Sequence, residues 1–272
     1  MNSAIYINKY SDKSSLEERQ TNTHLFNKTV DRIKQLQPLE ILGILRSSAL
    51  YSLARSSVDV YRLAARVSPK LSLDRPATTA AELFKKMLRS SDGICLGETH
   101  GQRAAKVLLQ KNMAHLKRLG VNAFFVEGAD LIDDAWIQEF NAGKTNNISW
   151  AYPNDQDTLI TARQFGMKIY PIDCARGNSS SSRLLNLNFA TLLKVEEIKS
   201  KDPTLGKYIV WVGARHTNTA QIEKATIPGI SELLNIPSLI VIQKKIWRQE
   251  AIQEETKHPS LPGATANAII YC

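Results

Sequence analysis

The sequence has few cysteines and no long hydrophobic segment. Its 272 residues include three cysteines, Cys95, Cys174 and Cys272, which are widely spaced and form no Cys-x-x-Cys pair. This pattern argues against a disulfide framework and a structural zinc knuckle, and it favours a reducing cytosol. No run of about 18 uncharged apolar residues occurs, so we expect no membrane-spanning helix. The N-terminus also lacks the apolar core and cleavage site of a signal peptide, so we expect no export by the general secretory route.

Three familiar active-site motifs are missing as well. The sequence contains no Gly-x-Ser-x-Gly nucleophile elbow, no Gly-x-x-x-x-Gly-Lys phosphate loop and no Gly-x-Gly-x-x-Gly dinucleotide motif. Each of these motifs supplies a sharp turn or a row of backbone N–H groups that its chemistry needs. Their absence disfavours the enzyme classes that depend on them.

Positive charge is unevenly distributed along the chain. The formal net charge is +9, and segment 41–76 carries six basic and two acidic residues. Apolar residues recur there at helical intervals, which predicts an amphipathic helix or a pair of helices. The simplest interpretation is a helix that docks on the core with its arginines in water, and the alternative is contact with a membrane surface or an acidic partner. Aromatic residues are scarce in this segment and no recognition motif accompanies the charge, so we expect no nucleic-acid partner.

Composition divides the chain into three zones. Residues 1–29 are rich in Ser, Asn, Thr, Lys and Glu without a sustained period, which predicts a disordered leader. Residues 30–90 form a basic helical region that we expect to pack on the core. Residues 91–272 alternate short apolar runs with helix-length amphipathic segments. This alternation predicts an α/β fold with a largely parallel central sheet and helices on both faces.

The sequence predicts both kinds of element between residues 77 and 272. Strands are expected at 93–98, 122–128, 167–174, 207–216, 238–243 and 266–272. Helices are expected at 77–90, 102–119, 131–140, 158–165, 184–199 and 230–236, the first with a threonine cap and the second ended by Gly120.

Chemically active side chains follow the ends of the expected strands. In open α/β sheets the ligand crevice lies at the carboxyl ends of the strands. The candidate catalytic residues at these ends are Glu98, His100, Glu127, Asp173 and His216. A single one of them could be a helix cap or a histidine held by backbone groups. Their gathering at one sheet edge predicts an active site.

Two designs fit these residues. In the first, His100 or His216 is a general base on water, oriented by a carboxylate, and Arg103, Arg176 or Arg215 stabilises an oxyanion. In the second, imidazoles and carboxylates hold a divalent metal that lowers the pKa of bound water. The candidate metal ligands are His100, Glu127 and His216. The sequence does not choose between the two designs, so the cofactor is either a divalent metal or none.

The order of motifs resembles that of a known superfamily. LGETHG, FFVEG, YPIDC, VGARH and PGISELLNIPSLIVI occur in succession between Gly93 and Gln243. This succession is similar to that of the erythromycin esterase, ChaN and Tiki superfamily, whose members hydrolyse esters or peptides or bind iron and haem. The resemblance implies that Glu98, His100, Glu127 and His216 line the pocket, whereas Asp173 rests on its position at a strand end.

The N-terminal zones resemble a more specific group. A polar leader and a basic helical region before a small domain of this kind look like the HopBA type III effectors of plant-pathogenic bacteria. This resemblance implies a virulence effector that enters the host cytoplasm and triggers host cell death or immune recognition. The implied partners are a host immune receptor or target protein and a type III secretion chaperone. The alternatives are a cytosolic hydrolase of erythromycin-esterase type and a metal- or haem-binding protein of ChaN type.

Overall fold

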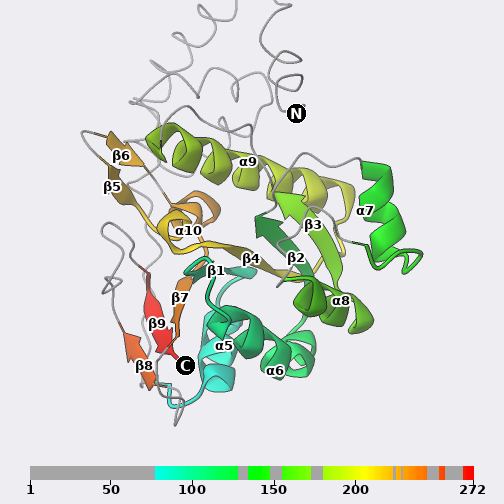
Figure 1. Ribbon diagram of the computed structural model, residues 1–272, viewed down its shortest axis with the longest axis horizontal. Helices are drawn as coiled ribbons and strands as arrows, with labels where there is room; N and C mark the ends of the chain where they lie inside the picture. Colours follow the sequence, from blue (N-terminus) through cyan, green and yellow to red (C-terminus); the bar gives the residue numbers. More distant parts are fainter. Residues whose placement is uncertain are drawn as a thin grey trace, which may run out of the picture.

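A seven-stranded sheet forms the centre of the computed structural model (Figure 1). The structure describes residues 77–127, 134–147, 155–172, 180–222, 225–227, 229–243, 251–254 and 266–272. The expected leader at 1–29 and most of the expected basic helical region lie outside these residues. The strands of the sheet are β1 (Gly93–Glu98), β2 (Val121–Glu127), β3 (Lys168–Ile172), β4 (Lys207–Gly213), β7 (Ser238–Ile242), β8 (Ala251–Glu254) and β9 (Ala268–Tyr271).

The sheet is largely parallel, as predicted. Its strand order is β3-β2-β4-β1-β7-β9-β8, and six of these strands run parallel while β8 pairs antiparallel with β9. The central strands β1 and β7 are buried along their whole length. Near-continuous apolar strands of this kind form when helices cover both faces of a sheet.

Six helices are described around the sheet. They are α5 (Ala80–Arg89), α6 (Ala104–Arg118), α7 (Asp134–Asn141), α8 (Gln156–Gln164), α9 (Ser180–Lys201) and α10 (Ile230–Leu234). The expected threonine cap is Thr79, whose hydroxyl accepts a hydrogen bond from the Glu82 N–H at 3.2 Å. Gly120 follows α6 with a φ of +90°, the left-handed conformation that glycine adopts easily after a helix. Among the residues that the structure describes, no helix has both the length and the apolar character needed to span a bilayer.

Alternating strand residues divide the core into two layers. On one face, buried side chains of α5, α6 and α8 pack with Ile94, Leu96, Phe124, Ile209 and Trp211. On the other face, α9 and α10 pack with Cys95, Phe125, Val210 and Val212. Figure 1 shows the same arrangement, with α9 and α10 across the sheet from α5 and α6. Because successive side chains of a strand point to opposite faces of the sheet, each layer of the core contains its own set of apolar strand residues.

The chain changes direction at the centre of the sheet. From β1 the chain passes through α6 to β2, which lies on the far side of β4. From β4 it passes through α10 to β7, which lies on the far side of β1. Because the neighbours β1 and β4 send their connections in opposite directions, their carboxyl ends border a crevice.

Strand β4 is shorter than the sequence predicts. It ends at Gly213, and residues Ala214–His216 form the 3-10 helix η1, so the expectation of a strand to residue 216 is wrong. The chain turns here across β1, since a Cβ on Gly97 would lie 2.9 Å from Ala214 Cα. A strand end cannot be read from apolar residues alone when the turn depends on such a contact.

Three short strands were not expected from the sequence. β8 lies at one edge of the sheet, and β5 (Ala220–Ile222) pairs with β6 (Ala225–Ile227) in a separate antiparallel hairpin. Segments of three or four residues are too short for an apolar alternation to be recognised.

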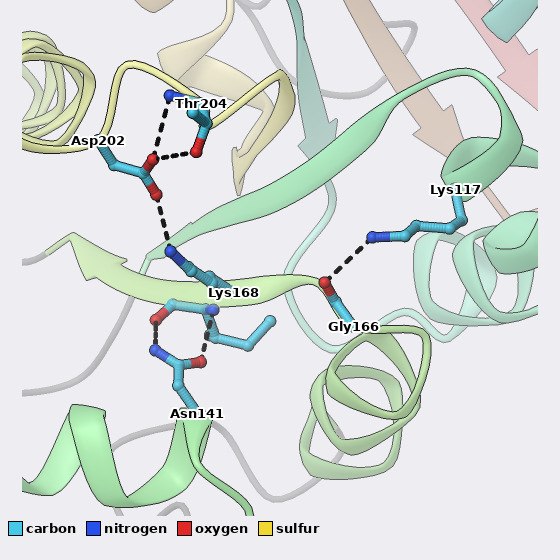
Figure 2. Close-up of polar contacts among 7 residues, drawn as sticks. Lys117, Asn141, Gly166, Lys168, Asp202 and Thr204 are labelled. Carbon is cyan, nitrogen blue, oxygen red and sulfur yellow. Dashed lines mark hydrogen bonds and ion pairs between the residues drawn. The ribbon is translucent and has the colours of Figure 1, made fainter.

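The opposite edge strand, β3, is covered by side chains (Figure 2). The Asn141 amide at the end of α7 donates to the Ile169 carbonyl at 2.9 Å and accepts from the Ile169 N–H at 2.8 Å. Lys168 forms an ion pair with Asp202 at 2.7 Å. Asn141 therefore occupies backbone groups that an edge strand would otherwise present to another chain.

Candidate functional site

Two buried carboxylates and one imidazole meet at the carboxyl ends of the central strands. Glu98 is the last residue of β1 and Glu127 the last residue of β2, and the side chains of both are 6% exposed. His100 follows Glu98 by two residues, in the turn that leads to α6, and its side chain is 53% exposed. The ring is therefore accessible from solvent while the carboxylates beneath it are not.

The two carboxylates face opposite nitrogens of the ring. His100 Nδ1 lies 3.5 Å from Glu98 Oε1, and His100 Nε2 lies 3.9 Å from Glu127 Oε2. These distances are too long for strong hydrogen bonds, although contacts in an unliganded site commonly shorten when substrate binds. The structure thus brings together Glu98, His100 and Glu127, three of the predicted residues.

Each carboxylate is held in place by a donor from β4. The Trp211 indole N–H donates to Glu98 Oε2 at 2.9 Å, and the Gly213 backbone N–H donates to Glu127 Oε2 at 2.8 Å. Buried carboxylates need such donors because removing them from water is costly. Trp211 is a site residue that the sequence did not reveal, since an apolar strand position is typical of a core tryptophan.

A small pocket opens between these side chains. It is lined by Glu98, His100, Val126, Glu127, Asp155, Trp211 and Val212, and its volume is about 190 Å³ with the space at its mouth included. The two buried carboxylates, the His100 ring and Asp155 therefore line one small cavity.

A buried ion pair lies at this pocket and was not predicted. Asp155, the residue before α8, lines the pocket, and its Oδ1 lies 2.8 Å from Lys106 Nζ of α6. The side chains are 4% and 8% exposed, respectively. Burial raises the pKa of Asp155, the Lys106 contact opposes this rise, and the negative charge of Glu98 adds to it. In the sequence Asp155 has the appearance of an ordinary helix cap.

His216 is buried in η1. It is a described residue but is not one of the seven that line the pocket. Its Nδ1 lies 2.7 Å from Oδ1 of Asn188, a fully buried residue of α9. Because an amide oxygen only accepts, Nδ1 is the donor in this hydrogen bond. Asp173, the fifth predicted catalytic residue, lies outside the described residues.

The residues named for the two chemical designs can be compared with the described part of the chain. No group of three or more His, Cys, Asp or Glu side chains there is arranged to hold a metal ion, so the structure identifies no metal ligand among His100, Glu127 and His216. Of the three arginines suggested for an oxyanion, Arg103 and Arg215 are exposed, and Arg176 lies outside the described residues. The described geometry places the imidazole of His100 near two carboxylates, those of Glu98 and Glu127.

Comparison with known proteins gives a fold but no family. No protein-family model matches the sequence, and no curated protein matches it. Among solved structures, the type III effector HopBA1 is similar with a TM-score of 0.52 and 16% identity, over 75% of this chain and 97% of that chain. At this identity the likeness shows a shared fold, so the predicted resemblance to HopBA effectors is supported at the level of fold, whereas the erythromycin esterase superfamily is not shown.

Two toxin structures are also similar over part of their length. They are RRSP, a MARTX toxin effector domain from Vibrio vulnificus (TM-score 0.46, 21% identity), and the C-terminal region of Pasteurella multocida toxin (TM-score 0.46, 14% identity). The matches cover 65% and 75% of this chain, which spans 37% and 30% of those chains.

Proposed function

We propose that this protein is a bacterial virulence effector that acts inside a host cell and that its pocket hydrolyses an acyl bond, either an ester or an amide. The observation that carries the chemistry is the position of His100 between Glu98 and Glu127 at the switch point of the sheet. The effector role is supported by the fold shared with a type III effector, of whose chain the match covers 97%.

The pocket contains the groups that such a reaction needs. One carboxylate takes a proton from the attacking water, whose oxygen adds to the acyl carbon. The bond to the leaving alcohol or amine then breaks, and the imidazolium of His100 gives the leaving group a proton. The proton held by the carboxylate afterwards returns to the ring. The Trp211 and Gly213 donors keep the two carboxylates oriented during these steps. Solvent exposure of His100 lets the scissile bond reach the ring from outside.

The biological part of the proposal concerns delivery and response. A polar leader at 1–29 would suit passage through a type III secretion channel, with a chaperone bound before export. In the host cytoplasm the product of the reaction, or the protein itself, would engage a target or an immune receptor and cause cell death. The arginines of the basic segment 41–76 would be available to an acidic membrane surface or an acidic partner.

Expression inside plant cells tests the pocket. We expect wild-type protein to cause cell death and His100→Ala to cause none, because His100 is the proton donor. His115→Ala is the matched control, since His115 lies on α6, where its ring contacts the Ala81 carbonyl of α5 at 3.0 Å. Both variants are compared at equal protein level. Cell death caused equally by His100→Ala would refute a catalytic pocket and favour recognition of the protein surface.

Removal of residues 1–29 tests the delivery route separately. We expect the truncated protein to lose translocation from bacteria into host cells while keeping its activity when it is expressed directly in the host. Translocation without the leader would contradict the assignment of this segment as the secretion signal.

A further inference from the structure

Asp155 occupies a helix-cap position but does not cap the helix. Aspartate before the first turn of a helix normally accepts hydrogen bonds from free backbone N–H groups of that turn. Asp155 precedes α8, yet its side chain makes no capping hydrogen bond. Its carboxylate is turned to Lys106 and to the pocket instead. The chain therefore gives up local helix stabilisation at this position.

Its partner is equally unfavourable for local structure. Lys106 is the third residue of α6 and lies in the first turn, which contains no acidic residue. A positive charge there opposes the helix dipole, because cations are stabilised at the other end of a helix. Lysine is also rarely buried, and this side chain is 8% exposed. Neither the helix dipole nor burial explains a lysine at position 106.

Stability does not explain the pair either. Bringing two charges into a protein interior has a desolvation cost that their attraction often fails to repay. Apolar side chains of similar volume at such positions are often as stable or more stable. Departures from local rules of this kind occur mainly at functional sites.

From these observations we infer that the Lys106–Asp155 ion pair belongs to the pocket, and that Asp155 is a positioning residue which favours the protonated ring of His100. Of the described residues, the charged groups that line the pocket with this ring are the carboxylates of Glu98, Glu127 and Asp155, and Lys106 is the counter-ion of the last. Among these groups, three carboxylates against one ammonium leave a net negative charge, which stabilises an imidazolium.

The role of a protonated His100 rests on the proposed hydrolysis, and it assigns the acid and the base of that reaction. A protonated His100 acts first as the acid that serves the leaving group. A carboxylate must then be the base, and Glu127 is suited to this role because Gly213 holds it beside Nε2 of the ring. Lys106 favours the ionised form of Asp155 without approaching the reacting atoms itself.

An NMR titration of the His100 ring tests the inference independently of any activity. We expect Asp155→Asn to lower the pH at which the ring loses its proton, because one of the three negative charges is removed. Asp157→Asn is the matched control, since Asp157 is an exposed aspartate two residues further along α8, and it should leave the titration unchanged. An equal midpoint in wild type and Asp155→Asn, or a higher one in the variant, would overturn the inference.

A double variant covers the case in which Asp155→Asn fails to fold. Lys106→Met with Asp155→Leu removes both charges and keeps their volume, so we expect a midpoint of chemical unfolding at least equal to that of wild type. Because one positive and one negative charge are removed together, the net charge of these groups stays the same, and His100 should titrate near the wild-type pH. A clear loss of stability in the double variant would show that the pair serves the fold, which contradicts the inference. Absence of cell death with wild-type protein would count against the proposed function alone, because the titration does not depend on it.

Discussion

Replacing Gly213 by alanine should displace His100 without removing any chemical group. A Cβ on Gly213 would lie 2.7 Å from His100 Nε2, whereas ordinary contacts begin at 3.4 Å. The ring must therefore move away from Gly213, by about 0.7 Å to reach ordinary contact. A misplacement of about 1 Å at a reacting group can reduce a rate by roughly 10²-fold. We expect cell death to be delayed or lost at protein levels at which wild type is fully active.

The same substitution should have little effect on stability. Gly213 has φ −62° and ψ 146°, which alanine adopts without strain. The half-exposed ring can rotate into solvent, and alanine lowers the entropy of the unfolded chain, so the free energy of unfolding should change by about 1 kcal/mol or less. Urea unfolding followed by circular dichroism measures this change.

A second glycine provides the opposite control. Gly143 has φ +75°, and no atom lies within 4 Å of the position that a Cβ would take there, so Gly143→Ala should cost about 1–2 kcal/mol of stability through backbone strain alone. It should leave cell death unchanged because it follows α7, away from the pocket lining. If Gly213→Ala were as active as wild type, the position of His100 against Glu127 would not matter and the proposed chemistry would be refuted.

Two further predictions concern buried carboxylates. Trp211→Phe leaves Glu98 Oε2 without its indole donor, so urea unfolding should show a loss of about 1–3 kcal/mol, and unchanged stability would contradict this contact. Burial raises the pKa of Glu232 above its ordinary value of 4.5, so the folded state holds the Glu232 proton more tightly than the unfolded state does. This proton stabilises the fold at low pH, and the stabilisation is lost as the pH rises through the pKa that Glu232 has in the folded state. Glu232→Gln cannot lose a proton there, and its stability relative to wild type should therefore increase between pH 4.5 and pH 8; a constant difference across this range would contradict the assignment.

The residues of the site differ in how far the sequence reveals them. Glu98 and Glu127 could be predicted because each directly follows an apolar run, and parallel strands bring such positions to one edge. Asp155 and Lys106 are 49 positions apart, and each has an ordinary local explanation as a helix cap or a surface lysine. Only their juxtaposition shows that both explanations fail.

The end of β4 was also beyond what the sequence could predict. The sequence placed Glu98, Glu127 and His216 together as strand-end residues, but β4 stops at Gly213 and His216 belongs to η1. That turn depends on the close approach of Ala214 to Gly97, a contact between segments more than 100 residues apart. A local pattern contains no information on such a contact.

The sequence by itself determined the α/β class, the order of the main strands and helices, and the residues that terminate β1 and β2. It could do so because apolar periodicity and helix-end residues act within a few positions along the chain. Tertiary structure decided which of these residues meet, which donors hold the carboxylates, and that Lys106 and Asp155 join the pocket. These outcomes depend on strand order and on distances between remote segments. In the buried interior, charges and hydrogen bonds also interact more strongly than they do in water.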